Sequence, residues 1–146
     1  MPFLFDSSIY IDALRAGGGA AVVMQRWARE SPLWLSAVVL EELHAGASRK
    51  DYPVLAKLER DFERAQRVLV PNLGDWTHAG KVLARLAEKY GVERIGKARL
   101  TNDALIATSA ARTGITVVTV NQRDFGRLAE FCPLRWQATR KPGSVQ

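Results

Sequence analysis

Short apolar runs alternate with longer stretches of helical character along most of this chain. The apolar runs predict buried strands at residues 3–5, 32–36, 67–70, 115–120 and, as an edge strand, 133–136. Strands that alternate with helices predict a mostly parallel sheet whose two faces are covered by helices. The expected fold class is therefore α/β, a three-layer α/β/α arrangement around a central sheet of four or five strands.

Helical patterns fill the intervals between these strands. One helix begins at Ser7 or Ser8 and ends before the glycines at 17–19, because a run of glycines breaks a helix. Further helical patterns cover residues 20–30, 37–47, 51–65, 74–90 and 101–114. Connections of this kind are what parallel strands require, since a tight hairpin cannot join them.

Two of these helices carry more detailed predictions. The pattern at 74–90 is the most regular, and its predicted buried face consists of Trp76, Ala79, Leu83, Leu86, Ala87 and Tyr90. In the helix at 101–114, Thr101 or Asn102 is the candidate N-cap, which places Asp103 at the start of that helix.

The composition is that of an ordinary soluble protein with one domain. A chain of 146 residues suffices for one sizeable core, and 47% hydrophobic with 25% charged residues is a typical balance. We expect no signal peptide and no membrane span, because the N-terminus lacks a basic region and no apolar stretch is long enough. Cys132 is the only cysteine, which excludes an intrachain disulfide and fits a reducing cytoplasm.

Basic residues outnumber acidic ones along the chain. The formal net charge is +6 and the isoelectric point is near 9.9. This charge favours a polyanionic partner such as a nucleic acid, although a small basic protein can also be merely soluble.

Acidic residues follow two strands of the predicted sheet. Asp6 comes directly after the strand at 3–5, and Asn121 and Asp124 follow the strand at 115–120. Ligands of open α/β sheets bind beyond the carboxyl ends of the strands, so these side chains are candidates for a site. Taken singly, each carboxylate could instead cap a helix, where it offsets the helix dipole by about 0.3–1 kcal/mol.

Glu41 and Glu42 are neighbours with different predicted environments. At about 100° of rotation per helical residue, the core face of helix 37–47 passes through Leu40 and Leu43. Glu41 points away from that face into solvent, whereas Glu42 lies on its border. Glu42 is therefore the half-buried carboxylate of the two.

Carboxylates that converge at one edge of a sheet need compensation. Two of them about 4 Å apart repel by roughly 4 kcal/mol at an effective dielectric constant near 20. Either some take up protons, with raised pKa values, or a hard divalent cation binds, and oxygen ligands at a phosphate-handling site suit Mg²⁺ or Mn²⁺. Such an ion promotes phosphodiester hydrolysis, and the basic surface would hold the nucleic-acid backbone.

Four segments, in order along nearly the whole chain, resemble the motifs of PIN-domain ribonucleases of the VapC toxin type. They are "FLFDSSIYID", "SAVVLEELHAG", "LTNDALIATSAARTG" and "VVTVNQRDFGRL". The second motif selects Glu42 and not Glu41, in agreement with the helical geometry. One departure is the pair Ser7-Ser8, where the family more often has Thr-Asn.

The resemblance implies a metal-dependent endoribonuclease, the toxin component of a type II (VapBC-like) toxin–antitoxin system. It implies Mg²⁺ (or Mn²⁺) and a cytoplasmic homodimer, or a hetero-oligomer with a cognate antitoxin that blocks the site, with no membrane partner. Residues 1–138 would form a single PIN domain, and 139–146 a polar tail that we expect to be poorly ordered. The implied catalytic and metal-binding residues are Asp6, Glu42, Asp103 and Asp124, supported by Ser7, Thr119 and Asn121.

Other interpretations of these residues stay open. Arg94, Lys97 and Arg99 precede Asp103 and are assigned either to RNA phosphates or to a solvated connector. The chain could also be a non-toxin PIN-domain nuclease, or a non-catalytic nucleic-acid-binding PIN domain, although the latter usually lacks one or more of the acidic residues. A haloacid-dehalogenase-like phosphatase would need a second aspartate where Ser8 stands, and a phospho-receiver would need an acidic pair that is absent.

Overall fold

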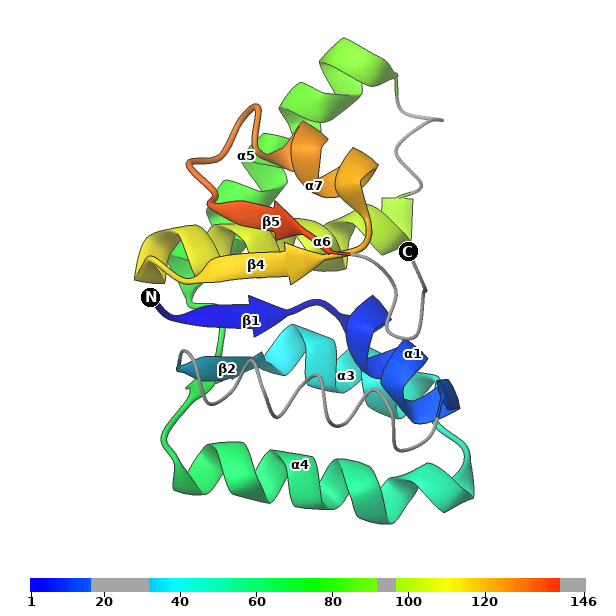
Figure 1. The fold of residues 1–146 in the computed structure, drawn as a ribbon. Coiled ribbons are helices and arrows are strands. Elements are labelled where there is room, and N and C mark those ends of the chain that lie inside the picture. Colours follow the sequence, from blue (N-terminus) through cyan, green and yellow to red (C-terminus); the bar gives the residue numbers. More distant parts are fainter. Residues whose placement is uncertain (17–31, 92–96, 140–146) are drawn as a thin grey trace.

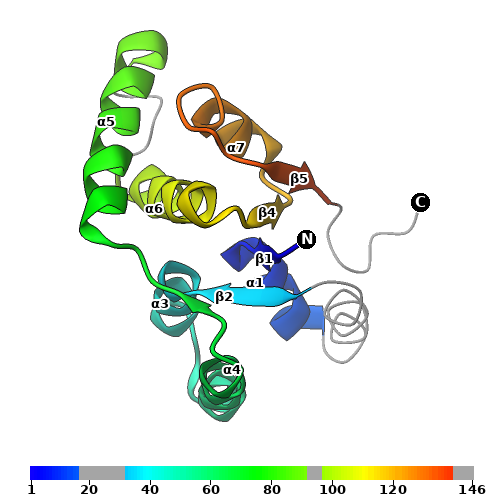
Figure 2. The same cartoon turned by 90° about the vertical axis from the view of Figure 1, so that its left-hand side faces the viewer.

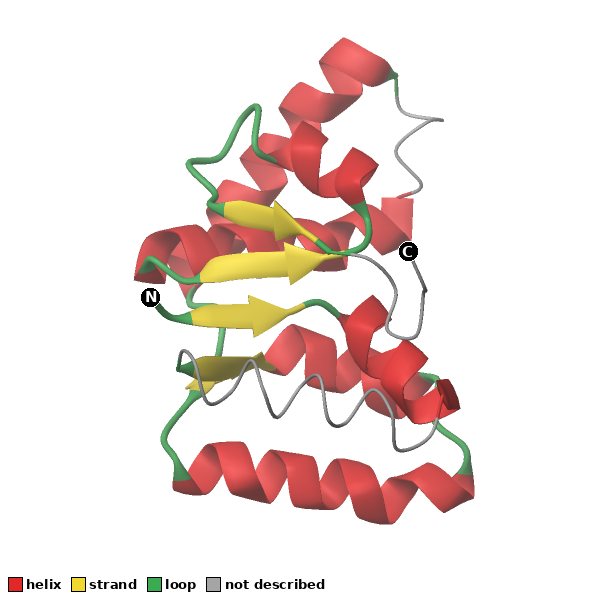
Figure 3. Cartoon of the chain, viewed as in Figure 1, coloured by secondary structure: helices red, strands yellow, loops and turns green. Residues whose placement is uncertain are grey.

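The computed structural model describes residues 1–16, 32–91 and 97–139. Five strands form one sheet in the order β3-β2-β1-β4-β5, and every neighbouring pair is parallel. The strands are β1 (Phe3–Phe5), β2 (Leu33–Ser36), β3 (Val68–Leu69), β4 (Thr116–Thr119) and β5 (Trp136–Ala138). Figure 3 shows β1, β4 and β5 pointing the same way. The predicted α/β class with a parallel sheet of four or five strands is confirmed.

Helices surround this sheet. They are α1 (Ser7–Ala16), α3 (Ala37–Ala45), α4 (Tyr52–Arg64), α5 (Leu73–Tyr90), α6 (Lys97–Thr113) and α7 (Gln122–Leu128), with a short 3-10 helix at Arg49–Asp51. In Figure 1, α5, α6 and α7 gather around β4 and β5, whereas α3 and α4 lie on the side of β2. Figure 2 shows the same groups from the side, with α5 and α6 stacked on one another. No described helix is long and apolar enough to cross a bilayer.

The core is centred on β1 and β4. Leu4, Val117 and Val118 are completely buried, and all three residues of β1 are inaccessible. Central parallel strands are covered on both faces, which is why their sequences are continuous apolar runs and do not alternate with polar residues. The predicted helix at 20–30, the glycines at 17–19 and the tail from 140 onward lie outside the described residues.

Two predictions about helices are wrong in detail. Trp76 is 56% exposed, and the first turn of α5 buries Asp75 instead, because that carboxylate pairs with Arg112 of α6. Helix α6 already begins at Lys97, so Asn102 is not its N-cap and Asp103 lies in its second turn.

The last strand is also displaced from its predicted position. It covers Trp136–Ala138 and not 133–136, but it forms an edge of the sheet as predicted. Its register pairs Val117 with Trp136, which places residues 136–138 beside β4.

Candidate active site

Three helices start at the carboxyl edge of the central strands. Helix α1 follows β1, α3 follows β2 and α7 follows β4, and in Figure 1 α1 and α7 begin near the arrowheads of β1 and β4. The backbone N–H of Asp6 donates to the carbonyl of Val118 at 3.1 Å, so β1 and β4 stay paired up to this point. Asp6 is therefore held at the edge where ligands of parallel sheets bind.

The Asp6 carboxylate is buried and accepts hydrogen bonds from neutral groups. Its side chain accepts from the hydroxyls of Ser8 and Thr119, both at 2.5 Å, and the residue is 4% exposed. Burial raises the pKa of Asp6, and the hydroxyls together with nearby backbone N–H groups only partly oppose this rise. Within the described residues no Lys, Arg or His forms an ion pair with it.

Glu42 lies within electrostatic reach of Asp6. Burial raises the pKa of Glu42, hydrogen bonds from Ser7 and Asn102 lower it, and the negative charges of Glu41 and Asp6 raise it further. Its Oε1 atom is buried and has no hydrogen-bond partner. Glu41 is exposed, as predicted from the helical geometry, whereas Glu42 is half-buried. The structure thus brings two of the predicted carboxylates close enough for their charges to interact.

A chain of hydrogen bonds leads from Asp6 to Asp124. The backbone N–H of Asn121 donates to the Thr119 hydroxyl at 2.8 Å, and the Asn121 amide donates to Asp124 at 2.8 Å. Asn121 is also the N-cap of α7 and accepts from the Asp124 N–H. Thr119 and Asn121 therefore contact the carboxylates on either side of them. Their supporting role at an active site stays a prediction.

Asp103 lies on α6. It is 9% exposed, and its neighbour Asn102 donates a 3.2 Å hydrogen bond to Glu41 while also bonding Glu42. Asn102 thus links α6 to α3, a contact that the sequence pattern did not reveal because this residue was assigned to a helix cap. The signal available in the sequence was the position of Asn102, a polar residue directly before the predicted ligand Asp103.

The donor set suits a hard divalent ion. In the arrangement described here, no group of three or more His, Cys, Asp or Glu side chains is positioned to hold a metal. Nevertheless the oxygens are those that Mg²⁺ and Mn²⁺ prefer, and the buried, unpartnered Oε1 of Glu42 is an atom that such an ion would satisfy. The convergence of Asp6, Glu42, Asp103 and Asp124 on one ion stays a prediction.

The basic residues predicted to bind RNA cannot be placed. Arg94 lies outside the described residues, and for Lys97 and Arg99 only the helix to which they belong is described. Their contact with phosphate stays a prediction.

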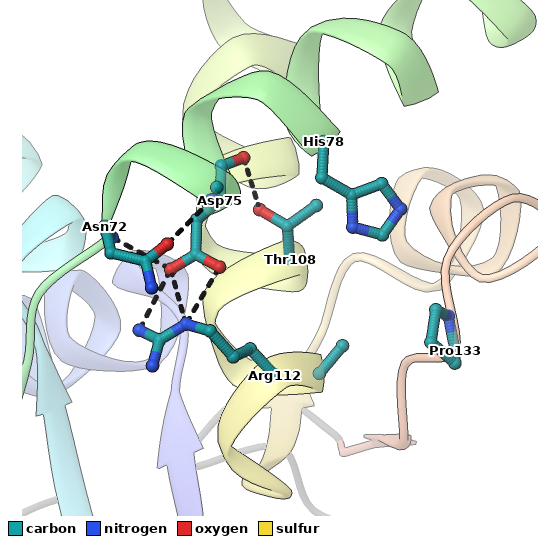
Figure 4. Close-up of a pocket in the computed structure, with 8 residues that line it drawn as sticks. Asn72, Asp75, His78, Thr108, Arg112 and Pro133 are labelled. Atoms are coloured by element: carbon teal, nitrogen blue, oxygen red, sulfur yellow. Dashed lines mark hydrogen bonds and ion pairs between the residues drawn. The ribbon is translucent and has the colours of Figure 1, made fainter.

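A second polar cluster lies apart from these residues, in a cavity of about 300 Å³ between α5 and α6 (Figure 4). Asp75 is 3% exposed there, and it accepts from Arg112 at 3.0 Å and from the Asn72 backbone N–H at 3.0 Å. Thr108 donates to the Asp75 carbonyl. None of the predicted site residues lines this cavity.

Comparisons with known proteins give a family and a set of similar folds. The PIN domain family model matches residues 3–131. No curated protein sequence matches the chain.

Three solved structures illustrate the structural similarity. A chain of VapBC2 from Rickettsia felis, bound to a DNA fragment from its promoter, is 23% identical and has a TM-score of 0.67, with coverage of 96% of this chain and 100% of that one. DNA-bound VapBC from Salmonella typhimurium is 25% identical with a TM-score of 0.67, covering 94% and 98%. VapBC-1 from nontypeable Haemophilus influenzae is 25% identical with a TM-score of 0.64, also covering 94% and 98%.

Proposed function

Since this chain belongs to the PIN domain family, we propose that it is a Mg²⁺- or Mn²⁺-dependent endoribonuclease and the toxin of a VapBC-like toxin–antitoxin pair. The observation that carries the proposal is the buried Asp6 beside the half-buried Glu42, since their charges repel each other and neither has a basic partner among the described residues. A buried carboxylate without a counter-charge is costly, so a cation from outside the chain is the natural complement.

Each side chain has a role in this proposal. Asp6, Glu42, Asp103 and Asp124 would hold the ion, which would supply charge stabilisation at the phosphate and a more acidic water. Thr119 holds Asp6 and Asn121 holds Asp124, so these ligands need little reorganisation. Glu42, whose pKa is raised, is suited either to bind the ion or to orient the attacking water and take its proton.

The test is cleavage of single-stranded RNA by the purified protein with Mg²⁺ or Mn²⁺, compared with EDTA. Glu42→Gln should lower the rate at least about 100-fold, since the loss of a ligand should exceed the 10–100-fold effect of losing an outer partner. Glu41→Gln is the matched control, because the neighbouring carboxylate is exposed, and it should retain near wild-type activity. Equal rates for Glu42→Gln and wild type would overturn the assignment. RNA binding without metal-dependent cleavage would favour a non-catalytic PIN domain.

We also propose that a small antitoxin binds the chain and blocks the site. The support is the similarity to chains solved as VapBC. With RNA as the substrate, we expect the activity in the cytoplasm. The expected result is copurification with a small protein encoded nearby and loss of cleavage in that complex. Full cleavage by the complex would contradict this part of the proposal.

A homodimer has its own support in the structure. Three large apolar side chains are exposed within seven residues at the start of α5, namely Val70 (61%), Leu73 (81%) and Trp76 (56%). Such a patch on a small protein is typical of an interface. Light scattering should give a dimer for the wild type and a monomer for Trp76→Glu, and a monomeric wild type would contradict it.

A further inference from the structure

One face of the molecule combines basic and aromatic side chains in a way that the proposed chemistry does not use. It is formed by the second half of α5 and by α7 with the residues just after it. These two helices are in contact, and Figure 1 shows α7 in front of α5. We call this surface the α5–α7 track, and its members are Arg85, Lys89, Tyr90, Arg127 and Phe131.

Two arginines in the track are held by aromatic rings. The Cζ atom of Arg127 lies 4.3 Å from the centre of the Tyr90 ring, and that of Arg85 lies 5.9 Å from the centre of the Phe131 ring. Among the described residues, neither guanidinium forms a hydrogen bond or an ion pair. A guanidinium on a ring face is positioned by the cation–π contact, while its N–H donors stay available for a planar anion such as phosphate.

One acidic residue beside the track, Glu130, already has other partners. Glu130 accepts from Lys89 at 2.5 Å and from the Tyr90 hydroxyl at 2.6 Å. The Lys89 hydrogen bond is the main reason why the pKa of Glu130 is lowered, and the charge of Arg127 contributes less. Glu130 therefore fixes the Tyr90 ring beneath Arg127 and is balanced by Lys89. Among the described residues, neither Arg85 nor Arg127 forms an ion pair.

Helix α4 differs from the track because its basic and acidic residues balance within one helix. Its three basic residues are accompanied by three acidic ones on the same helix. Lys57 and Asp61 form an i,i+4 ion pair at 2.6 Å, with both side chains more than half exposed. The helix carries no net charge, so the net charge of +6 is not spread evenly over the surface.

The track begins beside the candidate active site. Arg127 lies one helical turn after Asp124 on α7, and α7 begins at Gln122, three residues after the end of β4. Residues three apart on a helix are neighbours on its surface. A nucleic-acid strand placed at Asp6 and Asp124 would therefore meet Arg127 first and Arg85 next.

We propose that Arg127 and Arg85 bind consecutive parts of the phosphate backbone of the single-stranded RNA substrate on one side of the cleavage site. This inference rests on the proposed function for the identity of its ligand. Phosphate contacts of this kind bind without sequence preference and weaken with salt.

The experiment measures binding of the full chain to labelled single-stranded RNA in EDTA, where no cleavage occurs. In the double variant Arg85→Gln/Arg127→Gln, we expect about tenfold weaker binding. The slope of log K against log salt concentration should be less steep by about 1.4, which is about 0.7 for each of two phosphate contacts. Arg127→Lys should recover part of the affinity because it restores the charge. Arg60→Gln/Arg64→Gln on α4 is the charge-matched control and should bind like the wild type.

Three outcomes would overturn the inference. In the first, the track variant and the wild type bind single-stranded RNA with equal affinity and equal salt dependence. In the second, the α4 control loses as much RNA affinity as the track variant. In the third, the track variant binds single-stranded RNA normally and loses only its binding to duplex DNA or to an antitoxin. Unfolding midpoints verify that each variant is folded. If the track variant loses RNA binding while the wild type cleaves no RNA, the track stands as an RNA surface and only the proposed catalysis fails.

Discussion

Asp6 and Asp75 are equally buried, at 4% and 3% exposure, and yet their surroundings differ in one respect. Asp75 has a cation, because Arg112 donates to both of its oxygens at 3.0 Å (Figure 4). Asp6 has only neutral donors, with Ser8 and Thr119 nearest to its oxygens. The chain compensates the charge of Asp75 with Arg112, and among the described residues it provides no cation for Asp6.

Under the proposed function, this difference separates a structural carboxylate from a metal-binding one. The pair of Asp75 and Arg112 joins α5 to α6 and completes the N-terminal capping box with Asn72. Asp6 instead faces the added repulsion of Glu42. A fold that tolerates such an arrangement gives up stability at that place, which is common at functional sites.

The strongest test of the difference between Asp6 and Asp75 is to neutralise each aspartate in turn. Asp6→Asn should reduce RNA cleavage at least about 100-fold, more than the 10–100-fold typical of an outer partner. Asp75→Asn should leave cleavage per folded molecule unchanged, since its charge serves only Arg112. RNA cleavage is measured at a temperature below the unfolding midpoints of both variants, so that both are folded. Similar losses in the two variants would mean that burial, and not the missing cation, marks the site.

Stability should respond in the opposite direction. Arg112→Met leaves Asp75 buried without its cation and should lower the free energy of unfolding by about 1–3 kcal/mol. The value lies below that of a fully buried pair because the Arg112 side chain is 40% exposed. Asp6→Asn removes a buried charge and should leave the stability of the metal-free protein equal or higher. Denaturant unfolding measures both, and a strongly destabilised Asp6→Asn would contradict the comparison.

The smallest effect concerns pH. Burial raises the folded-state pKa of Asp6 above 3.8 and that of Glu42 above 4.5, so in this window the folded protein binds more protons than the unfolded chain. The free energy of unfolding of the metal-free protein should therefore fall as pH rises from these ordinary values through the raised ones. Asp6→Asn should make this fall shallower. An unchanged pH dependence in that variant would show that Asp6 does not titrate as described.

The sequence predicted where several candidate site residues lie in the fold better than it predicted their contacts. The alternation of strands and helices placed Asp6 and Asn121 at one sheet edge, and the 100° rotation per residue separated Glu42 from Glu41. Both predictions depend only on local geometry, which a sequence pattern reports directly. Asp103 was selected as a candidate by the similarity of the motifs. No local pattern indicated that it would lie in the second turn of α6.

Long-range pairing limited the remaining predictions. Trp76 has the apolar character of a core residue, but Asp75 takes the inward position because Arg112, 37 residues later, provides its partner. Asn102 is a good capping residue by type, but α6 begins earlier and its amide binds Glu41 across 61 residues. Such choices are made by tertiary contacts, which override local preference.

Binding of Mn²⁺ by the metal-free protein, measured by isothermal titration calorimetry, tests the central claim most directly. Wild type and Glu41→Gln should bind the ion with similar affinity, and binding should tighten as pH rises because the carboxylates must lose protons. Asp6→Asn and Glu42→Gln should bind at least about tenfold more weakly, the lower limit for losing a group that supports a metal site. Undiminished Mn²⁺ binding by Asp6→Asn would contradict the claim that this buried carboxylate binds a metal ion.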